Sequence, residues 1–241
     1  MKMHATSNRP TGQERKWRTS VLIGLACLLL LLAGSVPGLA DTWQVEVRWV
    51  PDGDTMYLHS GQKIRLKGID APETGHEKSP RQYYALESRQ KLENLVEGRL
   101  LSIEAETLDA DRYGRILAYV RLSDGRFLNS LLIRQGTAFF YPHPGQDQPH
   151  EDELLLSQQR AMRERRGFWS HILTMPAANR PYLGNAGSLR FHTPECPYGQ
   201  RIKPENRVEF DNLRQAFHAG YAPGRNCTPW PLSSVTYSLS D

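Results

Sequence analysis

The pattern of apolar and polar residues predicts several short strands in the middle of the chain. Trp43, Val45, Val47 and Trp49 alternate with polar residues along 43–50, which is the period of a half-buried strand. Turn-forming Gly, Pro, Asp and Ser residues follow this segment and separate it from other extended segments. Further strands are expected at 55–59, 63–69, 101–106 and 116–122.

Helical spacing appears in three segments. A first helix is expected at 81–97, ended by Gly98. A second runs from a cap at Asn129 to Gln135 and ends at Gly136, and a third covers about 151–166. Strands and helices in this order predict an α+β fold, a five-stranded β-barrel of the OB type with about three helices. A small C-terminal module follows it.

The N-terminus has the pattern of an export signal. Arg15, Lys16 and Arg18 precede the apolar run 21–33, and small residues lead up to Ala40. The run is short for a membrane span of about 20 residues, so we expect a cleaved signal peptide and a secreted or periplasmic protein. An uncleaved membrane anchor is the alternative.

Charge changes the picture little once this segment is set aside. Residues 1–40 hold five of the 30 Lys and Arg residues and one of the 26 acids, so the rest of the chain has 25 of each. A global basic field for nucleic acid is therefore absent. We divide the chain into a signal at 1–40, a barrel domain at 41–173, a linker at 174–181, a Cys/His module at 182–230 and a polar tail at 231–241.

Three acids and two arginines lie at or near the ends of the expected strands. Asp54 opens the second strand and Asp70 closes the third, so their carboxylates could meet and hold a hard cation together with the carbonyl of Ala71. Glu73 would lie beside a metal-held water as its general base. Arg65 precedes Asp70 by an odd number of residues, so a bend near Gly68 is needed to bring them together. Arg65 and Arg115 would bind phosphate oxygens and neutralise developing charge.

These residues lie in three motifs, Asp52-Gly-Asp-Thr55, Arg65-(four residues)-Asp70-x-Pro-Glu73 and Asp111-Arg-Tyr-Gly-Arg115. With the supporting segments 132–136 and 167–169, they make residues 43–173 resemble the staphylococcal-nuclease-like (thermonuclease) family. The resemblance implies an OB barrel and Ca²⁺-dependent endonuclease hydrolysis of DNA and RNA.

Site roles follow from the same resemblance. It implies Asp54, Asp70 and the Ala71 carbonyl as metal ligands, Glu73 as general base, and Arg65 and Arg115 as phosphate-binding catalytic residues. Arg112 and Tyr113 match positions that contact the neighbouring nucleotide phosphate. The aromatic segment 139–141 is offset from the family pattern, so we expect it to pack in the core.

The C-terminal module, 182–230, resembles an Ada-type zinc-binding module that has lost one ligand, because Gly224 stands where a cysteine belongs. The remaining set is His192, Cys196 and Cys227, fewer than the four ligands of a structural zinc site. The competing interpretation is a Cys196–Cys227 disulfide. Export and the two cysteines left after signal cleavage favour the disulfide over Zn²⁺.

The leading functional hypothesis is a secreted nuclease that acts on DNA and RNA with little sequence preference, because phosphate contacts carry no sequence information. The alternative is a non-catalytic OB-fold protein that binds nucleic acid, and a third possibility makes the C-terminal module the functional part. Retention of the whole acid set favours the nuclease. We expect a monomer with no membrane contact after signal cleavage.

Overall fold

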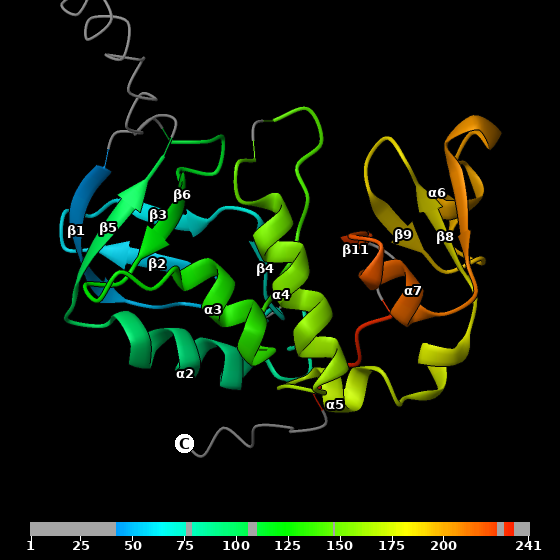
Figure 1. Ribbon diagram of the computed structural model, residues 1–241, viewed down its shortest axis with the longest axis horizontal. Helices are drawn as coiled ribbons and strands as arrows, with labels where there is room; N and C mark the ends of the chain where they lie inside the picture. The colour runs from blue at the N-terminus through cyan, green and yellow to red at the C-terminus, as the bar shows by residue number, and fades with distance from the viewer. Residues whose placement is uncertain (1–41, 76–78, 106–109, 147, 226–228, 234–241) are drawn as a thin grey trace, which may run out of the picture. The chain divides into compact units, whose positions relative to one another are not determined.

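The computed structural model describes residues 42–75, 79–105, 110–146, 148–225 and 229–233. The middle of the chain forms a closed barrel with strand order β1-β2-β3-β6-β5 (Figure 1). Neighbouring strands are antiparallel, except that β3 pairs with β6 in parallel. The barrel strands are β1 (Thr42–Trp49), β2 (Thr55–Leu58), β3 (Lys63–Leu66), β5 (Leu100–Glu104) and β6 (Ile116–Arg121).

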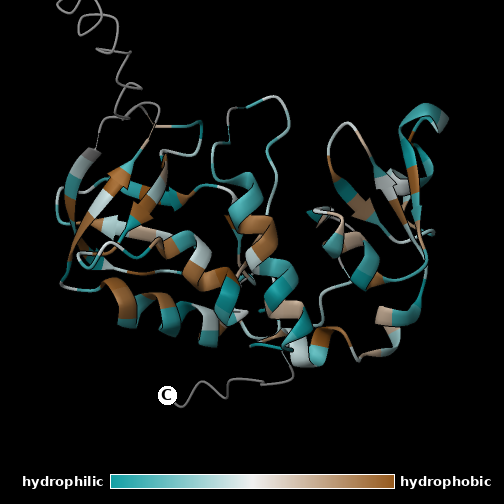
Figure 2. Cartoon of the chain, in the orientation of Figure 1, coloured by the Kyte–Doolittle hydropathy of each residue, from teal (hydrophilic) through white to brown (hydrophobic). Residues whose placement is uncertain are grey.

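Alternate residues of these strands fill the barrel. Met56 and Leu58 of β2 are buried, as are Ile64 and Leu66 of β3, because successive side chains of a strand point to opposite faces. Figure 2 shows hydrophobic residues on the strands, and hydrophobic residues interspersed with hydrophilic ones along the helices. The helices around the barrel are α2 (Ala85–Val96), α3 (Leu128–Gln135) and α4 (Glu151–Arg163). The predicted five-stranded barrel with about three helices is therefore confirmed.

Two helix starts differ from the prediction. The first helix begins at Ala85 rather than at 81, since Tyr84 has a left-handed backbone with φ 68°. Asn129 lies inside α3, and its buried amide accepts from Val120 N at 3.0 Å and donates to Lys67 O at 2.8 Å. The residue predicted as a helix cap therefore joins α3 to the barrel. Gly136 does end α3, with φ 68°.

The third predicted strand is broken where a bend was required. Lys67 and Gly68 separate β3 from the short β4 (Ile69–Asp70), which pairs with β7 (Phe139–Phe140). Gly68 has φ 76°, and a Cβ there would lie 2.6 Å from Leu154 Cδ1, so both its backbone and its packing call for glycine. Because of the bend, Asp70 lies on β4, which pairs with β7 instead of continuing β3.

The C-terminal part forms a second sheet with order β10-β8-β9-β11. The segment predicted as a linker contains a short 3₁₀ helix, η1 (Pro176–Asn179), after α5 (Trp169–Ile172). The remaining elements are β8 (Tyr182–Asn185), β9 (Arg190–His192), α6 (Pro197–Gln200), η2 (Pro204–Asn206), β10 (Arg207–Phe210), α7 (Leu213–His218) and β11 (Ala222–Pro223).

Apolar side chains gather into two clusters. One fills the barrel and includes Phe140. The other joins Phe139 and Trp169 to Phe191 and Phe217 of the C-terminal sheet and its helix. The predicted core role of 139–141 is confirmed for Phe139 and Phe140, which are 4% and 1% exposed, whereas Tyr141 is only half-buried. The C-terminal sheet therefore packs against β7, α4 and α5 through one apolar cluster.

The segment predicted as a signal peptide lies outside the described residues. In the ranges given above, no helix combines the length and apolar character needed to cross a membrane. The first residues of the predicted tail are ordered by pairing, because Tyr83 N donates to Pro231 O at 2.8 Å and Ser233 N donates to Arg81 O at 2.9 Å.

Candidate active site

Asp54, Arg65 and Asp70 meet at one end of the barrel. Arg65 Nη1 lies 2.9 Å from Asp54 Oδ2, and Arg65 Nη2 pairs with Asp70 Oδ1. Asp54 also accepts from the amide of Ala71 at 2.8 Å and from the hydroxyl of Thr55 at 3.0 Å. The two acids that the sequence places 16 residues apart are thus joined by one guanidinium.

Arg65 is fixed before any substrate arrives. Its side chain is 9% exposed, and Nη1 also donates to Ile69 O at 3.1 Å. This carbonyl becomes available because the chain bends at Gly68 between β3 and β4. The bend required by the odd spacing of Arg65 and Asp70 therefore exists.

Negative charge is in excess at this end of the barrel. Asp52, Asp70 and Glu73 line the same pocket, and Asp54 adjoins it through the turn in which Asp52 Oδ1 accepts from Asp54 N at 3.1 Å. The pKa of Asp54 is raised to about 6, chiefly by burial and also by the nearby Asp70 and Glu73 carboxylates, while Arg65 opposes the change. Burial likewise raises the pKa of Asp52 to about 6, with the charge of Asp54 the next cause.

The pKa of Asp70 is also raised, chiefly by burial, while Arg65 opposes the change. These carboxylates repel one another and have only the buried Arg65 guanidinium between them. Such a cluster of oxygen ligands suits a hard divalent ion. Within the described ranges no three Asp, Glu, His or Cys side chains converge into a ready metal cluster. An ion here would therefore need main-chain and water oxygens as well as Asp54 and Asp70.

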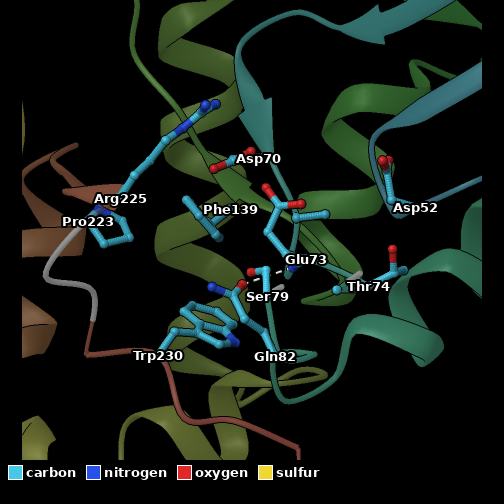
Figure 3. A pocket seen from close by; sticks show the side chains of 12 residues that line it. Asp52, Asp70, Glu73, Thr74, Ser79, Gln82, Phe139, Pro223, Arg225 and Trp230 are labelled. Atoms are coloured by element: carbon cyan, nitrogen blue, oxygen red, sulfur yellow. Dashed lines mark hydrogen bonds between the residues drawn. The ribbon is translucent and has the colours of Figure 1, made fainter. Parts of the chain in front are cut away.

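Glu73 projects into the pocket from the segment after β4 (Figure 3). Glu73 is exposed, and both its backbone N–H and its backbone C=O bond to Gln82. Glu73 N donates to Gln82 Oε1 at 2.8 Å, and Gln82 N donates to Glu73 O at 3.0 Å. A carboxylate on a fixed backbone with a free, solvated head group suits proton transfer.

Arg115 lies at the start of the strand next to that of Arg65. Ile64 of β3 is paired with Ile116 of β6. Arg115, the residue before Ile116, therefore lies beside β3, the strand that carries Arg65. The side chain of Arg115 is 22% exposed and pairs with Asp111 at 2.8 Å. Tyr113 is 55% exposed, and its ring lies under the guanidinium groups of Arg112 and Arg115 at 4.8 and 5.0 Å. These three side chains form an accessible cationic and aromatic ridge.

The pKa of His143 is affected by several positive charges. Its pKa is lowered to about 4, first by burial and then by the charges of Arg190, Arg65, Lys67 and Arg115. Arg65 and Arg115, far apart in sequence, therefore act on the same side chain. Acidic groups around Asp70 and the positive charges of Arg65 and Arg115 thus occur together, as expected for a bound cation beside a phosphate.

Sequence reasoning missed four residues of this site. Asp52 was visible in the Asp-Gly-Asp motif but was assigned only to the turn. Gln82, His143 and Arg225 carried no motif, because tertiary contacts alone bring their segments to the site. The Ala71 carbonyl as a metal ligand stays a prediction.

The proposed zinc ligands of the C-terminal module are partly described. His192 Nδ1 lies 3.5 Å from the sulfur of Cys196. A Cβ on Gly224 would lie 2.3 Å from His192 Cε1, so the imidazole fills the space toward which a cysteine at 224 would point. Cys196 is disulfide-bonded. Cys227 lies outside the described residues, so its pairing stays a prediction.

Comparison with known proteins agrees with this geometry. Residues 63–171 match the family described as staphylococcal nuclease homologue. An uncharacterized endonuclease of Escherichia coli is 34% identical over 152 residues, which cover 61% of this chain and 91% of that protein. The thermonuclease of Staphylococcus hyicus is 30% identical over 173 residues, which cover 65% of this chain and 99% of that protein. The chain therefore belongs to the staphylococcal nuclease family.

Proposed function

We propose that this protein is a Ca²⁺-dependent endonuclease that hydrolyses phosphodiester bonds of DNA and RNA with little sequence preference. The observation that carries the proposal is the joining of Asp54 and Asp70 through Arg65, next to a pocket that Asp70 and an exposed Glu73 line. Two of the relatives are a thermonuclease and an uncharacterized endonuclease, which supports the same reaction class.

The acids would hold the ion. Asp54, Asp70 and the Ala71 carbonyl are the proposed protein ligands, and bound Ca²⁺ would supply positive charge to the phosphate. Arg65 now shares its charge with both aspartates. With those carboxylates neutralised, Arg65 would have guanidinium donors available for phosphate oxygens.

Glu73 would act as the general base. It would accept a proton from the water that attacks phosphorus, while Arg65 and Arg115 stabilise the charge that builds on the phosphoryl oxygens. Arg112 and Tyr113 would contact the next phosphate and its nucleotide. All of these contacts involve the backbone of the nucleic acid, so they account for weak sequence preference.

A non-catalytic nucleic-acid-binding role is the second candidate. The exposed Tyr113 between two guanidinium groups would serve such a role equally well, because aromatic and cationic side chains bind single strands without chemistry. A buried acid cluster whose members repel one another has no use in a binder of polyanions, which favours the nuclease. Export through the N-terminal segment is proposed on the sequence pattern alone.

The decisive experiment is a cleavage assay with matched variants. Residues 41–241 should cleave single-stranded DNA with Ca²⁺ and stop on addition of chelator. Glu73→Gln should lower kcat by about 10²–10⁴-fold, the usual contribution of a general base, and leave the dissociation constant for DNA unchanged. Glu87→Gln, an exposed acid on α2, is the control and should keep full activity. Binding without cleavage by the wild-type protein would establish the second candidate instead.

A further inference from the structure

The C-terminal sheet forms one wall of the candidate active site. The pocket has a volume of about 490 Å³, within the range of sites that hold small ligands. Its lining includes Asp70 and Glu73 on one side and Pro223, Arg225 and Trp230 from the C-terminal part on the other (Figure 3). Catalytic acids and the end of the chain thus share one cavity.

Arg225 has the character of a ligand-binding group rather than a structural one. Its side chain is exposed, and Figure 3 shows it extending from the end of β11 toward Asp70. In the part of the chain that the structure describes, no hydrogen bond or ion pair within 4 Å holds its guanidinium. It is also the only base among the described lining residues. Partial burial lowers its pKa, but the charges of Asp70 and Glu73 act in the opposite direction and the pKa is raised on balance.

The backbone that carries Arg225 is anchored on both sides. Pro223 pairs with Phe191 of β9, and Gly224 N donates to Phe191 O at 2.8 Å. Beyond it, Trp230 Nε1 donates to Tyr83 O at 3.0 Å. A long cationic side chain on a fixed base can reach a ligand with a limited loss of backbone entropy.

We propose that Arg225 is a substrate-binding residue that contacts a backbone phosphate next to the scissile one. The C-terminal module would thereby complete the nucleic-acid groove. This inference rests on the proposed nuclease function. The cavity extends from Asp70 and Glu73 to Trp230, so a strand whose scissile phosphate lies at the acids continues past Arg225.

A phosphate is a better partner for Arg225 than either acid of the pocket. Bound Ca²⁺ would neutralise Asp70, and Glu73 is needed as an unpaired base. Arg225 would then face an incoming polyanion with its donors available, and guanidinium groups match phosphate oxygens in geometry.

The test compares Arg225→Ala and Arg225→Lys with the wild-type protein on two substrates. One is a single-stranded DNA oligonucleotide, and the other is a dinucleoside monophosphate, which has only the scissile phosphate. On the oligonucleotide we expect KM for Arg225→Ala to rise about tenfold with kcat nearly unchanged. The slope of log KM against log salt should fall by about 0.7, one phosphate contact on a single strand. Arg225→Lys should keep the slope, and the dinucleotide should be cleaved as by the wild type.

The control is Arg214→Ala, at an exposed base on α7 of the same module. It should change neither KM nor the slope of log KM against log salt. Fluorescence anisotropy with labelled oligonucleotide in a Glu73→Gln background gives a second readout, and Arg225→Ala should weaken binding about tenfold there.

Three outcomes would overturn the inference. The first is an unchanged KM and salt slope for Arg225→Ala, and the second is an equal loss on the dinucleotide. The third is tighter Ca²⁺ binding with unchanged DNA binding, which would make Arg225 a partner of Asp70 only. If the wild-type protein cleaves neither substrate, the proposed function is wrong, and the inference that rests on it is wrong too.

Discussion

Asp54 is the residue whose environment says most about the site. It is 6% exposed, touches Arg65, Ala71 and Thr55, and still has a pKa raised by burial to about 6. One shared guanidinium does not offset the desolvation of this carboxylate and the repulsion from its neighbours. The native state without a bound cation is therefore destabilised at the position where a cation would bind.

A pH dependence follows for the protein without Ca²⁺. The folded state binds the Asp54 proton more tightly than the unfolded chain, whose pKa is near 3.8. This carboxyl thus contributes stability that is fully present below pH 4 and lost as pH rises through about 6. Asp54→Asn mimics the protonated form. Its free energy of unfolding relative to that of the wild type should therefore increase by on the order of 2 kcal/mol from pH 4 to pH 7.

Urea denaturation in chelator at several pH values measures this difference, and Asp124→Asn, at an exposed salt bridge, is the control. Added Ca²⁺ should raise Tm of the wild type more at pH 7 than at pH 5. A stability difference between Asp54→Asn and wild type that does not vary with pH would contradict the argument.

The bend between β3 and β4 is the element that assembles the site. Without it, Arg65 and Asp70 would point to opposite faces of one strand. Gly68 supplies the left-handed backbone, and Gly68 O accepts from Tyr141 N at 3.0 Å. Asn129 of α3 holds the preceding carbonyl, that of Lys67. Local sequence permits the bend, and helices far along the chain hold it in place.

Gly68→Ala should therefore disturb both stability and the site. The positive φ and the 2.6 Å approach to Leu154 together should cost about 2–4 kcal/mol. Gly125→Ala is the matched control, because φ is 82° there but a Cβ would meet nothing within 4 Å, so about 1 kcal/mol is expected.

Urea denaturation gives the two free energies of unfolding, and the Ca²⁺ concentration for half-maximal cleavage should rise only for Gly68→Ala. Equal effects of the two substitutions would show that the packing against Leu154 does not matter.

The barrel and the C-terminal sheet are held together by polar as well as apolar contacts. Gln158 of α4 is fully buried. Its Oε1 accepts from Phe140 N at 2.8 Å and its Nε2 donates to Phe217 O at 2.7 Å. One side chain thus connects the strand beside the active site to helix α7. The division into a nuclease domain, linker and separate module stays a prediction, and these contacts argue that the parts unfold together.

Gln158→Leu should destabilise the whole protein. It leaves the buried N–H of Phe140 without its partner, while Phe217 O keeps the bond from Gly220 N at 3.1 Å, so a loss of about 1–3 kcal/mol is expected. Gln159→Leu is the control, since Gln159 makes a similar bond to His218 O at 2.9 Å on the exposed side and should cost about 0.5 kcal/mol or less.

Thermal unfolding followed by circular dichroism should show a single transition for both variants, at a lower Tm for Gln158→Leu. Two separate transitions would mean that barrel and C-terminal sheet unfold independently.

The local pattern of the sequence was enough for the barrel and the motif residues. Strand alternation located four barrel strands within a residue or two of their observed bounds, because the period of two reflects one buried face. Asp54, Asp70, Glu73 and the two arginines were visible as motifs in sequence. The exceptions were the start of α2 and the role of Asn129, where contacts between distant segments override local propensity.

Tertiary structure alone decided which other segments complete the site. Gln82 fixes the Glu73 backbone, the charges of Arg65 and Arg115 act on His143, and Arg225 enters the pocket from the C-terminal part of the chain. None of these residues carries a motif, since their positions depend on sheet pairing and on a shared apolar core between remote segments. Spacing along a chain can place residues on one strand or one turn, but only the closing of the fold sets distances between segments that are far apart in sequence.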